Sequence, residues 1–137
     1  MNFKNELLVN MGANEGITQG KAVFFQGIFM GNIEKVFPDS ALVQTIFDGN
    51  FKMPVRIGAA GYDGLLMGGT SPKVGSILKS APIKEGDIVI TADPRFLYGL
   101  PVGTVRDVTI SADNLFEETT IDFVYDVNSI QTVAIEK

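Results

Sequence analysis

The chain has 137 residues, a formal net charge of −5, and neither cysteine nor histidine. A globular chain of this length can bury a core without disulfide or metal cross-links. The missing thiols and imidazoles exclude zinc fingers, cysteine nucleophiles and any catalytic triad that relies on histidine. The negative charge does not provide the broad positive field that captures nucleic acid, so no nucleic-acid partner is expected.

Short runs rich in Val, Ile, Phe and Thr, separated by turn residues, predict an all-β fold with little helix. In chain order the predicted strands cover residues 22–25, 28–36, 41–46, 53–57, 77–79, 88–91, 102–110 and 121–127. The last of these alternates most regularly, because Ile121, Phe123, Tyr125 and Val127 fall on one face. Residues 3–9 fit either the end of a helix or a strand, and residues 115–118 fit a short helical turn.

The sequence contains an internal repeat. Residues 17–23 align with residues 83–89 at an offset of 66, residues 27–36 with 99–108 at an offset of 72, and residues 46–57 with 124–135 at an offset of 78. Each copy opens with Ile-x-x-Gly at Gly20 or Gly86, which permits a positive φ at the bend before the first strand. Gly31 and Gly103 lie inside strands and indicate bulges or close backbone approach.

A copy of about four strands has exposed edges, and closure into a small barrel removes them. We therefore predict two small β-barrels of about six strands each. Residues 1–16 form an N-terminal junction, residues 17–63 the first barrel unit, and residues 83–137 the second. Residues 64–82 connect the units and could add strands, including one at residues 64–67. The prediction allows strands to be exchanged between the units.

The order and spacing of these motifs resembles the β domain of the bacterial rod shape-determining MreC family. The first copy carries V-N-x-G-x-x-x-G-I-x-x-G-x-x-V at residues 9–23. The second carries G-D-x-V-x-T at residues 86–91 and G-L-P-V-G-x-V at residues 99–105, which is similar to the family's best-preserved stretch. The resemblance covers about residues 9–135 and departs from the family pattern at residues 92–94 and 127–129.

The resemblance implies a non-enzymatic scaffold of the cell-wall elongation complex that maintains cell shape by binding wall synthases. The implied partners are the penicillin-binding transpeptidase, the glycosyltransferase RodA, MreD, MreB and further copies of the protein itself. Family members resemble single-pass inner-membrane proteins with a cytoplasmic tail, a transmembrane helix, a coiled coil and a periplasmic or extracytoplasmic domain. We expect membrane attachment only through an N-terminal anchor that is missing here, with Met1 starting a shortened form and residues 2–8 remaining from the coiled-coil junction.

The candidate protein-interaction residues are Arg95, Phe96, Leu97 and Tyr98, in the stretch that contains the six-residue insertion of the second copy. Arginine beside exposed aromatic and aliphatic side chains is typical of an interaction hot spot. The alternative is that Phe96 and Leu97 fold back and plug the end of their own barrel. Elsewhere, Phe24 and Phe25 point to opposite faces of one strand, so we expect both in the core or in a seam between the barrels.

The sequence predicts neither catalytic nor metal-binding nor cofactor-binding residues. Ser71 and Ser80 have no histidine to activate them, and the nearby lysines (Lys73, Lys79 and Lys84) fit a solvated surface. Gly58-x-x-Gly61-x-x-Gly64 fits simple turns, and the carboxylates Glu117, Glu118, Asp122 and Asp126 fit a polar face. Two rival functions remain open: a module that binds peptidoglycan fragments in a groove between the barrels and, more weakly, a degenerate serine hydrolase.

Overall fold

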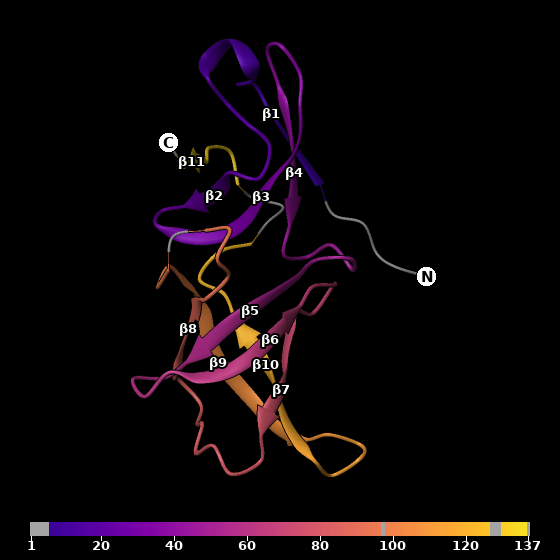
Figure 1. Cartoon of the computed structure of the whole chain (residues 1–137), viewed down its shortest axis with the longest axis vertical. Helices are drawn as coiled ribbons and strands as arrows, with labels where there is room; N and C mark the ends of the chain where they lie inside the picture. Colours follow the sequence, from indigo (N-terminus) through magenta and orange to yellow (C-terminus); the bar gives the residue numbers. More distant parts are fainter. Residues whose placement is uncertain (1–5, 97, 127–129, 137) are drawn as a thin grey trace.

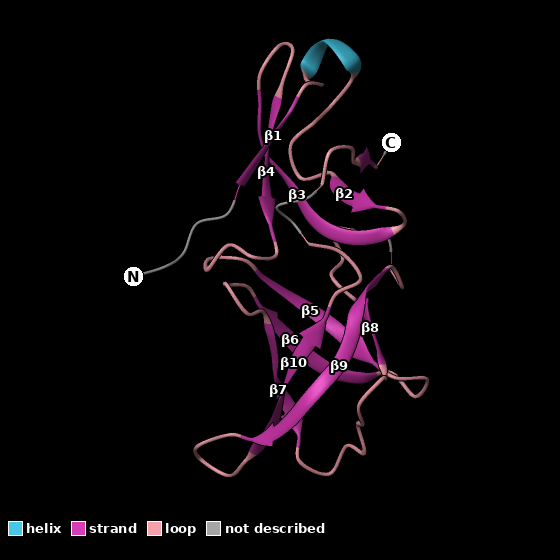
Figure 2. Cartoon of the chain, turned by 180° about the vertical axis from the view of Figure 1, so that it is seen from behind, coloured by secondary structure: helices cyan, strands magenta, loops and turns pink. Residues whose placement is uncertain are grey.

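Nearly all of the regular structure is β-strand (Figures 1 and 2). The structure is a computed structural model, and it describes residues 6–96, 98–126 and 130–136. The strands are β1 (Glu6–Val9), β2 (Ala22–Phe25), β3 (Ile28–Val36), β4 (Ala41–Thr45), β5 (Lys52–Ile57), β6 (Tyr62–Met67), β7 (Lys73–Leu78), β8 (Ile88–Thr91), β9 (Pro101–Ile110), β10 (Phe116–Asp122) and β11 (Ala134–Ile135). A single 3-10 turn, η1 (Ala13–Glu15), is the one helical element in the described residues. The predicted all-β fold with little helix is confirmed.

The strands form two sheets that lie one above the other in Figure 1. The lower sheet is a closed six-stranded barrel in the order β10-β7-β6-β5-β8-β9. The upper sheet, called here the open sheet, has five strands in the order β1-β4-β3-β2-β11. The molecule thus contains one complete barrel and one half-barrel, and every pairing between neighbouring strands is antiparallel.

The two copies of the repeat exchange their last strands. Ile57 of β5 pairs with Val89 of β8, and Ile135 of β11 pairs with Val23 of β2. These two pairs occupy equivalent positions in the two copies of the repeat. The alignment of the copies relates Ile57 to Ile135 at its offset of 78 and Val23 to Val89 at its offset of 66. Strand β5, from the predicted first unit, therefore closes the barrel of the second copy, and β11 from the second unit extends the sheet of the first.

Glycine is required where the backbones of the two copies bend or touch. Gly20 and Gly86 have φ values of 89° and 91°, as the Ile-x-x-Gly pattern predicts. Gly31 and Gly103 occupy equivalent positions opposite Val23 and Val89. A Cβ at Gly31 would overlap the carbonyl oxygen of Gln44, and a Cβ at Gly103 would overlap that of Asp122. Gln44 and Asp122 are themselves related by the repeat offset of 78.

Long-range pairing overrides the local pattern at two places. The helical turn predicted at residues 115–118 is wrong, because Phe116 and Glu117 begin β10 and pair with Leu78 and Ile77 of β7. The strand predicted at residues 121–127 ends at Asp122, although Phe123 and Tyr125 still turn inward while residues 124 and 126 are exposed. Val127 lies outside the described residues. In the opening segment, residues 6–9 form a strand that pairs with β4, and residues 3–5 lie outside the described residues.

The core joins the two sheets. One cluster fills the closed barrel with residues such as Met53, Leu66 and Ile77 and continues into the open sheet at Phe29. The Phe29 ring lies 5.1 Å from that of Phe96 and 6.2 Å from that of Phe51, centroid to centroid. A second cluster, which includes Val23, Met30, Ile33 and Val43, lies within the open sheet.

We predict that Gly31→Ala and Gly103→Ala each lower the free energy of unfolding by about 3 kcal/mol, because the new methyl group would displace a neighbouring strand. Gly75→Ala is the matched control, since its Cβ would approach the flexible side-chain end of Met67 to 2.9 Å and Glu118 Cγ only to 3.9 Å, with no backbone atom in the way. Its cost should stay below about 1 kcal/mol. Urea denaturation followed by circular dichroism measures all three variants, and equal losses would contradict the proposed strand contacts.

Candidate interaction surface

The loop of residues 92–100 is held at both ends by strand β8. The Thr91 N–H donates to the Leu100 carbonyl oxygen at 2.9 Å, and the Leu100 N–H donates to the Thr91 Oγ1 at 3.0 Å. The Gly99 N–H donates to the Thr91 carbonyl oxygen at 3.0 Å, and Gly99 has a φ of 85°. These bonds fix the point from which the loop projects.

A buried carboxylate organises the first half of the loop. The Asp93 side chain is 6% exposed and accepts hydrogen bonds from the Arg95 Nη2 at 2.7 Å, from Nε at 3.0 Å and from the Arg95 backbone N–H at 2.9 Å. Burial raises the pKa of the Asp93 carboxyl, but the hydrogen bonds and charge of Arg95 outweigh it and hold the pKa below its usual value. The hydrogen bond with Asp93 in turn raises the pKa of Arg95.

The structure separates the four predicted interaction residues. Phe96 is 6% exposed and packs on Phe29 of the open sheet, so it closes the seam between the two sheets. Tyr98 is 61% exposed, and the Arg95 side chain is 55% exposed with its guanidinium 5.0 Å above the Phe96 ring. Leu97 lies outside the described residues. Arg95 and Tyr98 therefore reach the surface from a base that Asp93 and Phe96 anchor.

Phe24 and Phe25 are adjacent residues of β2 and face opposite sides of the strand, as the strand geometry predicts. Phe24 packs against the core of the closed barrel, and Phe25 packs against the core of the open sheet. The two side chains thus each contribute to a different one of the two core clusters.

A second group of aromatic rings, called here the second seam, consists of Phe25, Phe47, Phe123 and Tyr125. The sequence did not predict that these four rings would meet. The ring centroid of Phe47 lies 5.1 Å from that of Phe123 and 6.3 Å from that of Tyr125. The ring centroids of Tyr125 and Phe25 are 5.6 Å apart. Phe47 and Tyr125 occupy equivalent positions in the two copies, at the offset of 78. The repeat alignment therefore contained the signal for this contact. Burial raises the pKa of the Tyr125 hydroxyl, which has no hydrogen-bond partner among the described residues.

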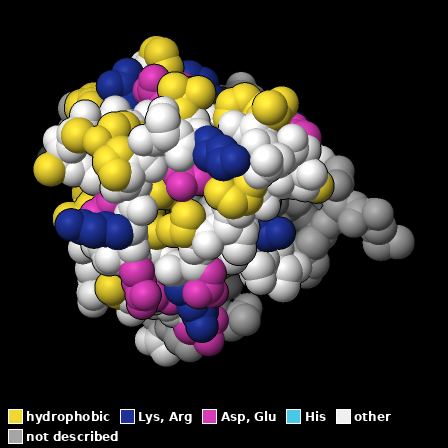
Figure 3. Space-filling model, turned by 90° about the horizontal axis from the view of Figure 1, so that it is seen from below, with side chains coloured by type: hydrophobic (Ala, Val, Ile, Leu, Met, Phe, Trp, Pro, Cys, Tyr) yellow, Lys and Arg dark blue, Asp and Glu magenta, His cyan; other side chains and the backbone are white. Residues whose placement is uncertain are grey.

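Apolar side chains also reach the surface at the far end of the closed barrel. Leu78, Ile110 and Leu115 are 64%, 46% and 63% exposed around the β9–β10 hairpin. Figure 3 shows hydrophobic side chains at this end in several groups, interspersed with acidic and basic ones. This barrel tip is a second candidate contact surface.

The residues considered for catalysis are dispersed on the surface. Ser71, Ser80 and Lys73 are exposed, and Lys79 donates from Nζ to the Asn114 Oδ1 at 3.1 Å. Gly58 and Gly61 form the turn between β5 and β6, with positive φ values and a bond from the Gly61 N–H to the Gly58 carbonyl oxygen. In the described parts of the chain, no three acidic residues group closely enough to hold a metal ion.

None of the helices in the described residues has the length and apolar character needed to cross a membrane.

A groove of about 370 Å³ lies beside the second seam. Its lining includes Phe47, Ser71, Pro72, Arg106, Thr120 and Phe123. Its lining comes from both predicted units, so it is a candidate for the ligand groove predicted between them.

Comparison with known proteins identifies the family. The family model described as "Rod shape-determining protein MreC, barrel core" matches residues 1–137. The cell shape-determining protein MreC of Haemophilus influenzae is 24% identical over 120 residues, which cover 83% of this chain and 34% of that protein. The chain thus spans about a third of the length of this curated relative.

Solved structures share the fold. One is described as the major periplasmic domain from the cell shape-determining filament MreC; its TM-score is 0.80 at 25% identity, covering 96% of this chain and 85% of that one. A second is a complex between penicillin-binding protein PBP2 and MreC from Helicobacter pylori, with a TM-score of 0.67 at 19% identity, covering 83% and 74%. The family match over the entire sequence and the shared two-sheet architecture lead to one conclusion: the chain belongs to the MreC family of rod shape-determining proteins.

Proposed function

We propose that this protein is a non-enzymatic scaffold of the bacterial cell-wall elongation complex, which maintains cell shape by holding wall synthases together. The observation that carries the proposal is the match of the family model to all 137 residues. The dispersed serines, lysines and carboxylates support a role in binding rather than in catalysis. The domain would act in the periplasm or outside the membrane, as the relative described as a periplasmic domain does.

The first proposed partner is a penicillin-binding transpeptidase. The MreC of Helicobacter pylori forms a complex with the penicillin-binding protein PBP2, and its fold is shared by this chain. RodA, MreD and MreB are further proposed partners through the family resemblance. Self-association is proposed as well, since one relative with the same fold is described as a filament.

Arg95 and Tyr98 are the proposed contact residues for the transpeptidase. Both side chains are more than half exposed, and the loop beneath them is fixed by Asp93 and Phe96. The hydrogen bonds between Asp93 and Arg95 already order the Arg95 side chain, which reduces the entropy lost when a partner binds, and arginine and tyrosine are frequent hot-spot residues. The peptidoglycan-fragment alternative stays a prediction for the groove beside the second seam, and calorimetry with muropeptides tests it.

We predict that the double variant R95A/Y98A binds the transpeptidase from the same organism at least about tenfold more weakly than the native protein. Surface plasmon resonance with the extracytoplasmic part of the transpeptidase measures the affinity. Arg106→Ala is the matched control, because Arg106 is 59% exposed and also faces carboxylates, but lies on β9 away from the loop. No binding by the native protein would contradict the proposed function, whereas equal binding by all variants would contradict only the assigned surface.

A second prediction concerns the anchor of the loop. Asp93→Asn should lower the free energy of unfolding by about 1–2 kcal/mol at pH 7, because the hydrogen bonds from Arg95 lose their charged acceptor. The pKa of Asp93 is lowered in the folded protein, so the carboxylate stabilises the fold above its unfolded pKa of about 4, and this contribution disappears as the pH falls through the lower folded value.

The difference between native protein and variant should therefore shrink as the pH falls below about 5 and through the lowered pKa of Asp93, in urea titrations at each pH. Asp63→Asn serves as the control, since Asp63 pairs with Arg56 on the surface and its side chain is 84% exposed. A difference that does not depend on pH would show that Asp93 acts through shape rather than charge.

A further inference from the structure

All three arginines of the chain lie beside carboxylates, but the carboxylates differ in their exposure. The side chain of Asp63, which pairs with Arg56, is 84% exposed. The side chains of Asp107 and Asp122, which face Arg106, are 73% and 55% exposed. At these two places the acidic and basic groups meet water side by side, so solvent screens both charges.

Arg95 is arranged differently, because its carboxylate partner lies beneath it. The Asp93 side chain is 6% exposed, whereas the Arg95 side chain is 55% exposed. The guanidinium is therefore the charged group that meets solvent. Residues 91–101 contain no other charged residue, so this loop contributes a single exposed charge, and that charge is positive.

The guanidinium group of Arg95 is held in place from two directions. Along one edge, Nε and Nη2 donate to the Asp93 carboxylate at 3.0 and 2.7 Å. Its Cζ lies over the Phe96 ring, 5.0 Å from the ring centroid, and Phe96 is itself buried against Phe29. The fold thus sets the orientation of the guanidinium before a partner binds.

The outer edge of the same guanidinium is available to a partner. In the described part of the chain, Arg95 makes its hydrogen bonds through Nε, Nη2 and its backbone N–H, and none through Nη1. The N–H groups of Nη1 and Nη2 along the outer edge form a fork that matches the two oxygens of a carboxylate. A charge-assisted pair of this kind is roughly twice as strong as hydrogen bonds to a neutral acceptor.

Asp93 does not cancel the attraction between Arg95 and a second carboxylate. Two carboxylates on the two edges of one guanidinium lie roughly 7 Å apart, whereas each lies about 4 Å from the charged centre. Because the Coulomb energy falls with distance, the attraction to Arg95 exceeds the repulsion from Asp93 by a factor of about two.

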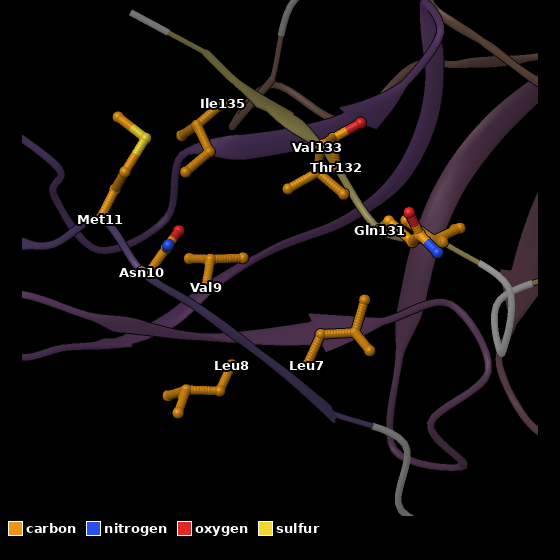
Figure 4. A pocket seen from close by; sticks show the side chains of 10 residues that line it. Leu7, Leu8, Val9, Asn10, Met11, Gln131, Thr132, Val133 and Ile135 are labelled. Atoms are coloured by element: carbon orange, nitrogen blue, oxygen red, sulfur yellow. The ribbon is translucent and has the colours of Figure 1, made fainter.

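The apolar surfaces elsewhere select no partner by charge. The groove of about 460 Å³ between β1 and residues 130–135 is lined by uncharged side chains (Figure 4). At the barrel tip, the exposed Leu78, Ile110 and Leu115 belong to a surface with charges of both signs. The loop of residues 92–100 is therefore the surface at which the charge of a partner can be inferred.

We propose that Arg95 binds an acidic side chain of the transpeptidase, an aspartate or glutamate whose carboxylate lies along the outer edge of the guanidinium, and that the exposed Tyr98 ring makes a second contact. This inference rests on the proposed scaffold function and specifies the chemistry of the partner at that surface.

The first test compares the native protein with the double variant D93N/R95Q, which replaces the ion pair by an amide pair and keeps the net charge of the chain. Surface plasmon resonance with the extracytoplasmic part of the transpeptidase measures affinity at about 50 mM and about 500 mM NaCl. The variant should bind at least about tenfold more weakly at low salt. The difference should shrink at high salt, because salt screens a contact between charges, whereas a loss of loop shape alone would not depend on salt.

Charge reversal tests the same contact from both sides. R95E should bind at least about tenfold more weakly than R95Q, because two carboxylates would face each other. R106E makes the same change in net charge on β9 and should bind like the native protein. Among single exchanges of exposed Asp and Glu residues of the transpeptidase to Lys, one should restore the binding of R95E. Circular dichroism establishes that each variant is folded, and if R95E is not, the salt dependence of D93N/R95Q decides.

Equal binding of folded R95E and R95Q would overturn the inference, as would a loss in D93N/R95Q that is the same at both salt concentrations. Failure of every lysine exchange to restore R95E would do so too. In these three cases binding by the native protein leaves the proposed function standing. No binding by the native protein would overturn both.

Discussion

The exchange of β5 and β11 between the two copies is the constraint on which the rest of the structure depends. Each sheet uses a strand from the other copy to satisfy the backbone hydrogen bonds of its first strand, β8 in one case and β2 in the other. Unpaired buried N–H and C=O groups are costly, so neither sheet can detach from the other without losing part of its own ladder. The two units therefore behave as one body although the sequence reads as two.

That coupling determines which loop residues can meet a partner. Because the sheets cannot separate, Phe96 of the segment after β8 stays buried against Phe29 of the other copy. Asp93 then orients Arg95, and the residue beyond the seam, Tyr98, is left in solvent. A contact residue whose side chain is already held suits a scaffold, since Arg95 loses less conformational entropy when a partner binds.

The sequence was informative wherever a structural requirement is local. Offsets between the copies identified equivalent positions, and the glycine pattern located the bends at Gly20 and Gly86, because a positive φ is tolerated mainly by glycine. Strand partners could not be derived in this way. The alternation in residues 53–57 predicts a strand but does not predict that β8 is its neighbour. In the same way, the sequence around Phe96 does not predict which aromatic ring Phe96 contacts. The helical turn predicted at residues 115–118 is wrong for the same reason, because pairing with β7 makes Phe116 and Glu117 extended.

Among the described residues, the closed barrel has one strand more than the open sheet, and that strand is β6. In the described part of the chain each copy supplies five strands, and β6 lies between the copies in the sequence and pairs within the closed barrel. It joins the ring of the second copy because β5, its hairpin partner, has already crossed to β8. The strand exchange that locks the two sheets together therefore also leaves β1 and β11 without a neighbour on one edge, among the residues described.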